Sequence, residues 1–354
     1  MSDLEGVPDP QKNFGSGRAW GAAKPKERRW PMGYALCSAG LSFESAELEK
    51  RYCEGRAESL FFFVDRMSVV MRLGVPTFAI ARQMRRWREE GHPPRAMPMA
   101  AMLIAVALLA VPLALAYGRG RWAMRMRAPA MIVTRGGVVP LAFITCVMDI
   151  IQLSKLPNWA SYLQWSLLCC GIFMTANTPF LMPLHFKHHL PLQLFVVSVM
   201  ICYQVPNLCH VVESRQDIHG FFKATWQAVS ARARDIVNIM FLSGPRTWGQ
   251  AELELGAKCQ HMYTSLHLVF GLVVPTYIWW LWEYQSRVFF LSKRCSREER
   301  RGEGEWAQLS LTSIASHVVI LVLFSAVCWE GLLGLFVDVD EGGVERRGAV
   351  GAIG

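Results

Sequence analysis

Three histidines lie within five residues, at positions 185, 188 and 189. A neutral imidazole nitrogen is a common protein ligand for transition metals, including iron. Three such groups at this spacing are able to share one metal ion where the chain turns between them. The pattern therefore raises a metal site made of His185, His188 and His189.

The segment His185-Phe-Lys-His188-His189 resembles one histidine box of the membrane fatty-acid desaturases and hydroxylases, which bind two irons. The resemblance implies oxidation of a lipid chain at an iron centre. That family uses several boxes on one membrane face, and the other histidines here form no second box. A short basic turn at headgroup level, closed by Pro183 and Pro191, also explains the segment. We favour that turn, without a cofactor, because a metal site needs a full set of supported ligands.

Isolated polar residues within apolar segments form a second group of candidates. Asp149 is the only acid of its segment, and His267 and His317 lie in uncharged runs on two later segments. Ionisable groups are costly in lipid and are functional candidates by default. Amides that would complete a polar interior are Gln164, Asn177, Gln204 and Asn207. Such a set suits proton- or ion-coupled transport. Interhelical hydrogen bonds that specify packing are the alternative, which we favour because no spacing marks one pathway.

Two of the ten cysteines, Cys209 and Cys259, bracket the longest connection between apolar segments. We expect both at helix ends on the same side of a membrane. An oxidising compartment on that side would allow a disulfide that staples the connection. A disulfide needs a Cα separation of about 4.4–6.8 Å, so the sequence leaves the paired and the free states open.

The elements that carry these residues are long apolar segments. Five of them exceed 20 residues without Asp, Glu, Lys or Arg: Ala96–Tyr117, Pro157–Leu184, Leu190–Val212, Cys259–Trp282 and Trp306–Trp329. A helix needs about 20 apolar residues to cross a bilayer. A sixth, weaker span is expected at Gly136–Ser154. The sequence thus predicts an all-α, polytopic transmembrane bundle over residues 59–336, between a disordered basic tail at 1–58 and a disordered tail at 337–354.

A seventh span depends on Ser59–Ala81, which is apolar but contains Asp65, Arg66 and Arg72. Asp65 and Arg72 lie seven residues apart and therefore share one face of a helix, which would point into a bundle. The alternative is a helix that lies flat in the membrane interface. The sequence supports both, so we expect six or seven spans.

The connection Glu213–Lys258 begins with the clearest helical period of the chain. Bulky apolar residues recur every three or four positions from Ile218 to Phe241, and basic residues occupy other faces. This pattern is typical of an amphipathic helix lying in the membrane interface. A helix packed over the end of the bundle fits the pattern equally well.

Composition places the chain among membrane proteins. It is 52% hydrophobic and only 18% charged, and its net charge of +9 comes from Lys and Arg next to the apolar segments. We interpret that charge as attraction to anionic lipid headgroups, and expect membrane lipids rather than nucleic acid as partners. The expected function is non-enzymatic movement or sensing of a small solute or ion by an integral membrane protein. The alternatives are a metal-dependent lipid oxidoreductase using the histidine turn, and a non-catalytic membrane scaffold.

Overall fold

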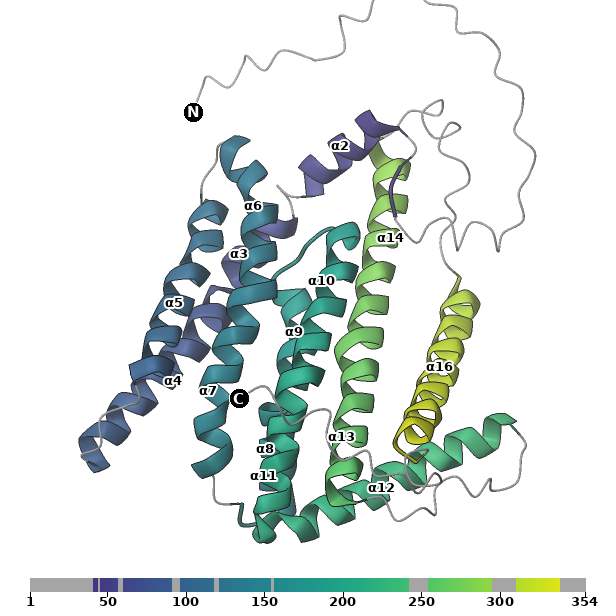
Figure 1. Ribbon diagram of the computed structural model, residues 1–354. Helices are drawn as coiled ribbons and strands as arrows, with labels where there is room; N and C mark the ends of the chain where they lie inside the picture. The colour runs from purple at the N-terminus through teal and green to yellow at the C-terminus, as the bar shows by residue number, and fades with distance from the viewer. Residues whose placement is uncertain are drawn as a thin grey trace, which may run out of the picture. The chain divides into compact units, whose positions relative to one another are not determined.

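The computed structural model describes residues 41–43, 45–56, 60–90, 96–117, 121–153, 156–241, 254–294 and 310–337. Within these residues every regular element is a helix and none is a strand, which confirms the all-α class (Figure 1). The predicted disordered segments at 1–40 and 338–354 lie outside the described residues.

The N-terminal half of this part contains α2 (Ala46–Arg56), α3 (Phe62–Met67), α4 (Val69–Glu90), α5 (Ala96–Tyr117), α6 (Arg121–Val133), η3 (Thr134–Val138), α7 (Val139–Leu153), α8 (Trp159–Cys169) and α9 (Ile172–Leu181). The C-terminal half contains α10 (Phe186–Val199), η4 (Met200–Gln204), α11 (Val205–Ser214), α12 (Gln216–Phe241), α13 (Leu255–Leu266), η6 (His267–Val273), α14 (Val274–Arg294) and α16 (Leu311–Val337). The elements η3, η4 and η6 are π-helical turns inserted in longer α-helices.

Four helical segments of the described residues have the length and apolar composition that a membrane crossing requires. They are Arg125–Thr145, Phe186–Ser214, Leu255–Lys293 and Leu311–Trp329. A fifth apolar stretch, Leu103–Pro112 within α5, is shorter. By this criterion the described residues contain fewer spans than the six or seven expected from the sequence.

One expected span, Pro157–Leu184, is not a continuous helix. It is interrupted at Gly171, which has a φ of +86° and separates α8 from α9. A Cβ atom at this position would lie 3.0 Å from Phe143 Cε1 and 3.1 Å from Met200 Sδ. Backbone conformation and crowding therefore both require glycine here. Hydropathy alone does not reveal this break, because the residues on either side of it are equally apolar.

The break leaves carbonyl oxygens at the end of α8 without helical partners, and two long side chains bond them. Gln204 Nε2 donates to the Cys169 carbonyl at 2.7 Å. His267 Nε2 donates to the Cys170 carbonyl at 2.8 Å. Both residues are buried, and an unpaired carbonyl there would cost free energy. The geometry thus gives Gln204 and His267 a structural task.

The span expected at Gly136–Ser154 begins earlier in the structure than the sequence predicts. α6, η3 and α7 run without interruption from Arg121 to Leu153, and the crossing segment within them is Arg125–Thr145. Arg135 consequently lies in the middle of a span rather than at its end. The apolar residues before it, from Ala128 to Val133, continue the helix through the arginine.

Residues 46–56 lie in the segment assigned to a disordered tail, but they form helix α2, where the sequence also allows a helix within Phe43–Leu60 with Ser45 as N-cap. The apolar side of α2 lies against α14. Leu48 and Tyr52 of α2 are buried in one cluster with Phe43 and with Leu291 of α14. The disorder predicted for residues 1–58 is therefore wrong for residues 46–56. The burial of Phe43, Leu48 and Tyr52 accounts for the order of this helix. The charged composition of the segment does not predict that burial.

The prediction that Asp65 and Arg72 share a buried face is confirmed. Asp65, in α3, and Arg72, in α4, are 0% and 5% exposed, and Arg72 Nη2 lies 2.7 Å from Asp65 Oδ1. This pairing balances two of the three charges that made the segment ambiguous. The α3–α4 region is not among the four candidate spans.

Helix α12 follows α11 directly and, in Figure 1, runs at a steep angle to α11 and α13. Its first half packs on the other helices through Ile218 and Phe222, which are fully buried. Farther along, Ile239 is 76% exposed. The helix thus packs partly over its neighbours and partly presents an open apolar face.

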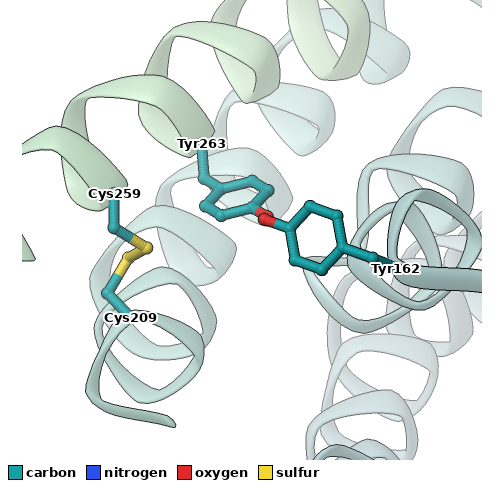
Figure 2. The surroundings of a disulfide bond; sticks show 4 residues. All are labelled: Tyr162, Cys209, Cys259 and Tyr263. Atoms are coloured by element: carbon teal, nitrogen blue, oxygen red, sulfur yellow. A yellow bond between two sulfur atoms is a disulfide. The ribbon is translucent and has the colours of Figure 1, made fainter. Parts of the chain in front are cut away.

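A disulfide joins Cys209 of α11 to Cys259 of α13, across 50 residues and a Cα separation of 5.6 Å. The bonded state is thus the one that the structure contains. Figure 2 shows the bond beside Tyr263, whose hydroxyl lies 3.3 Å from that of Tyr162 on α8. Both cysteines belong to the largest buried apolar cluster among the described residues. The bond therefore locks the two helices at the ends where they meet the α12 connection.

Candidate functional site

A buried cation lies at the centre of the described helices. Arg135, in the π-turn η3, is 1% exposed. Its Nη2 donates to His189 Nδ1 at 3.0 Å and also to Gln193 Oε1, both on α10. Because a guanidinium only donates, His189 Nδ1 is the acceptor and the ring proton is on Nε2.

Gln193 joins this arginine to two further elements. Its Nε2 donates to the Thr175 carbonyl on α9 at 2.9 Å and to the Gly271 carbonyl in η6. Gln193 is 1% exposed, so its amide is fully used within the protein. Arg135 and Gln193 together connect helical segments from four parts of the chain.

Local backbone geometry brings Arg135 close to α10. A Cβ added to the next residue, Gly136, would lie only 2.7 Å from Leu192 Cδ1, so the two helices approach closely because position 136 has no side chain. The site also uses two π-turns, η3 for Arg135 and η6 for the Gly271 carbonyl. π-Turns interrupt the regular hydrogen-bond ladder and occur often at functional sites.

The charge of Arg135 has no acidic partner among the residues that the structure describes. Its Nε and Nη1 are buried without a hydrogen-bond partner, and so is Nε2 of His189. An arginine keeps its charge under all ordinary conditions. Burying a charge without a counter-charge costs several kcal/mol or more. The cluster therefore offers spare donors and uncompensated positive charge inside the bundle, which is the chemistry of an anion site.

A second polar cluster lies at the start of α10, one helical turn from His189. Arg287 of α14 bonds Glu49 of α2 at 2.5 Å and Glu283 at 3.0 Å. Glu283 also accepts the Phe186 backbone N–H at 2.8 Å, which satisfies a donor at the α10 N-terminus. His185 Nδ1 lies 3.8 Å from Glu283 Oε1. These contacts fasten α2 to α14 and to the turn before α10.

Electrostatics in this second cluster favour charged Glu49 and neutral His185. Burial alone would raise the pKa of Glu49, but hydrogen bonds from Arg287 and from the Phe43 N–H hold it below its ordinary value. Burial lowers the pKa of His185; Glu283 opposes that shift, and the charges of Arg56 and Arg287 add to it. His185 is therefore less readily protonated than an exposed histidine.

A third buried group consists of Asp65, Arg72 and Arg127. Arg127 Nε lies 2.7 Å from Asp65 Oδ2, and Arg127 Nη2 donates to the Pro183 carbonyl at 2.9 Å. Arg72 Nε donates to the carbonyl of Leu181, the last residue of α9, at 3.1 Å. Carbonyls at a helix C-terminus attract cations. The carboxylate and the α9 terminus thus balance both arginines.

The three histidines of the turn have different surroundings. His189 joins Arg135, His185 faces Glu283, and His188 is partly exposed. The reason is that α10 begins at Phe186, so His185 precedes the helix and adjacent helical residues point in different directions. Within the described part of the chain, no three His, Cys, Asp or Glu side chains are grouped to hold a metal ion.

Among the described side chains, several polar residues expected inside spans have separate local partners. His317 Nδ1 lies 3.3 Å from the Tyr277 hydroxyl, and Asn177 Nδ2 donates to the Phe173 carbonyl in its own helix at 2.8 Å. Gln164 is exposed on α8. Asp149 belongs to α7, but its side chain lies outside the described part. These contacts match the packing role favoured for such residues, and a transport pathway through Asp149, His267 and His317 stays a prediction.

Sequence reasoning missed the two residues at the centre of the described helices, Arg135 and Gln193. Arg135 stands between the apolar residues 128–133 and an apolar run after Gly137, which is a signal in the sequence that the helix continues through the arginine. Gln193 gave no signal that distinguishes it from other amides in apolar segments.

Comparisons with known proteins add no relative. No protein-family model, curated protein or solved structure matches the chain.

Proposed function

We propose that this chain is a multi-pass integral membrane protein that binds a small anion, or the anionic group of a small solute, at Arg135. Binding there is the central step of transporting or sensing that solute. The observation that carries the proposal is the buried guanidinium with two spare donor nitrogens and no acidic partner among the described residues. An anion at this position would supply the missing counter-charge and accept the spare hydrogen bonds.

The proposal includes a membrane arrangement finer than the four candidate spans. α5 and the interrupted pair α8–α9 cross together with them, which makes six spans, and the paired charges of α3–α4 allow a seventh. α12 lies in the membrane interface, where the exposed face with Ile239 contacts lipid. The broken α8–α9 span supports a transport role, because discontinuous helices are common at substrate sites of transporters.

The test is anion binding and flux with variants of Arg135. Purified protein is titrated with phosphate, succinate and chloride, and the same anions are used for uptake into proteoliposomes. We expect R135Q to weaken binding at least tenfold and to reduce flux in proportion, because one charge-assisted contact contributes about 1.5–3 kcal/mol. R135K keeps the positive charge but loses the planar set of donors of a guanidinium. Its affinity and flux should therefore lie between those of the wild type and R135Q.

The control variant is H317Q. It alters the polar contact between His317 of α16 and the Tyr277 hydroxyl, which does not involve Arg135. It should bind and transport as the wild type does. Equal affinity in R135Q and wild type for every anion bound would contradict the proposal. So would a folded wild-type protein that binds none of the three anions.

A further inference from the structure

A second buried arginine shares the features that mark Arg135. Arg56, the last residue of α2, is 4% exposed. Its Nη1 donates to the Tyr52 hydroxyl at 2.7 Å, while its Nε and Nη2 are buried without a hydrogen-bond partner. No ion pair joins Arg56 to a carboxylate among the described residues; Glu49 and Glu283 pair with Arg287, and the charge of Arg56 acts on Glu283 without a direct contact between them.

The spare donors of Arg56 have a specific geometry. Nε and Nη2 lie on one edge of the guanidinium, the edge that binds two oxygens of a carboxylate or phosphate side by side. Aromatic rings occupy the region around its faces, with the Tyr52 and Phe61 centroids 5.7 and 5.6 Å from the guanidinium carbon. The two rings fix the plane of the guanidinium, so its Nε–Nη2 edge is the part that is able to bind a ligand.

Shared neighbours place Arg56 next to the start of α10. His185 packs against the same two rings, at 4.9 Å from Phe61 and 6.3 Å from Tyr52 between centroids. His185 and His189 are four residues apart, and His189 bonds Arg135. Each of these histidines also has one buried ring nitrogen without a hydrogen-bond partner. Arg56 thus lies near His185 and Arg135 bonds His189, and the two histidines are one helical turn apart. Both arginines have donors without a hydrogen-bond partner.

We propose that Arg56 forms a second anion-binding position, which takes a carboxylate or phosphate group through its Nε–Nη2 edge. This position lies at the end of the bundle beneath α2, and Arg135 forms the inner one. The inference rests on the proposed function at Arg135 and adds an outer position through which the same anion, or the phosphate of a lipid headgroup, is held.

The test is the number of anions bound. Equilibrium dialysis with labelled inorganic phosphate is carried out on the full-length protein in dodecyl maltoside micelles, whose headgroup carries no phosphate. The wild type is expected to bind two phosphates per chain, and R56Q and R135Q one each. R56K, which lacks the two-donor edge, should lose at least tenfold in affinity at one position only.

Y52F separates the edge of Arg56 from the folding of α2. It removes the bond to Nη1 but leaves Nε and Nη2 unchanged, so two phosphates should still bind. If Y52F loses the same phosphate as R56Q, the packing of α2 is responsible and the proposal is overturned. A stoichiometry of R56Q equal to that of the wild type overturns it as well.

Two further outcomes distinguish the ligand source and the two proposals. In nanodiscs that contain phosphatidylglycerol, loss of the Arg56-dependent phosphate alone identifies a lipid headgroup as the occupant, whereas two bound phosphates identify a soluble anion. If R135Q binds as the wild type does while R56Q loses one phosphate, the outer position stands and the function proposed for Arg135 fails. If the wild type binds one phosphate and only R135Q loses it, the function proposed for Arg135 stands and the outer position at Arg56 fails.

Discussion

The buried arginines of the described residues differ in what balances their charge. Arg72 and Arg127 share Asp65 and the carbonyls at the end of α9, and Arg287 holds two carboxylates. Arg135 bonds only a neutral imidazole and an amide. Because fully buried arginines are rare unless paired, Arg135 and Arg56, which have no ion pair among the described residues, are the strongest signs of a ligand.

Some of these residue-level features could be predicted from the sequence. The seven-residue spacing of Asp65 and Arg72 predicted a shared face, and their ion pair confirms it. The partners of Arg135 could not be predicted, because His189 and Gln193 are more than 50 residues away and helix packing alone brings them together. The different surroundings of the three histidines could not be predicted either, because they depend on α10 beginning at Phe186.

The acid stability of the protein should depend on His185. Its pKa is lowered from the ordinary value of 6.5, mainly by burial, so the unfolded chain takes up a proton more readily than the folded protein. The free energy of unfolding should therefore fall as the pH drops through about 6.5 and below. In H185Q this part of the pH dependence should be absent.

The measurement is chemical denaturation of wild type and H185Q in detergent between pH 7.5 and 5.5. Glu49 also loses stabilising charge in acid, since its pKa is lowered, but that loss occurs below its ordinary value of 4.5 and outside this window. Identical pH slopes for the two proteins would rule out His185 as a contributor.

At the scale of elements, hydropathy predicted where apolar helices occur but not where they break or begin. The break at Gly171 depends on a left-handed backbone and on crowding by Phe143 and Met200, which are distant in sequence. The order of α2 depends on contacts with α14. Both features arise from tertiary packing, which a periodicity or a hydropathy run does not contain.

The break between α8 and α9 should make position 171 intolerant of any side chain. G171A forces an alanine into the left-handed region, at a cost of about 1–2 kcal/mol, and adds contacts at 3.0 Å from Phe143. We expect a corresponding loss in the free energy of unfolding, measured by denaturation in detergent.

The matched control is G220A in α12. Nothing lies within 4 Å of a Cβ at that helical position. Alanine there should stabilise the helix by about 0.5–1 kcal/mol. A G171A protein as stable as G220A would show that the positive φ at position 171 does not constrain the fold.

At the scale of the whole molecule, the disulfide indicates how the bundle is oriented across a membrane. The segment Phe186–Ser214 has His185 before its first residue and Cys209 near its last, so the two lie toward opposite ends of one span. A stable disulfide requires an oxidising compartment. The end with Cys209 and α12 should face that compartment, and the end with α2 and His185 the cytosol. Arg127, from the basic segment 118–127, lies at the His185 end, as the positive-inside rule expects.

This orientation is tested with single cysteines at two exposed positions, in sealed vesicles of known sidedness. A membrane-impermeant maleimide should label Glu213→Cys from the exoplasmic side and Lys187→Cys only after permeabilisation. Both wild-type side chains are exposed, so labelling reports access rather than unfolding. The reversed labelling pattern would contradict the assigned direction.

The central claim is that Arg135 binds an anion inside the bundle, and anion-dependent thermal stability of the purified protein tests it most directly. A ligand at one hundred times its dissociation constant adds about 2.7 kcal/mol to the free energy of unfolding. Phosphate or succinate should therefore raise the melting temperature of the wild type by several degrees, and the part of that rise due to Arg135 should be missing in R135Q. An equal rise in both proteins, or no rise in the wild type with either anion, would contradict the account.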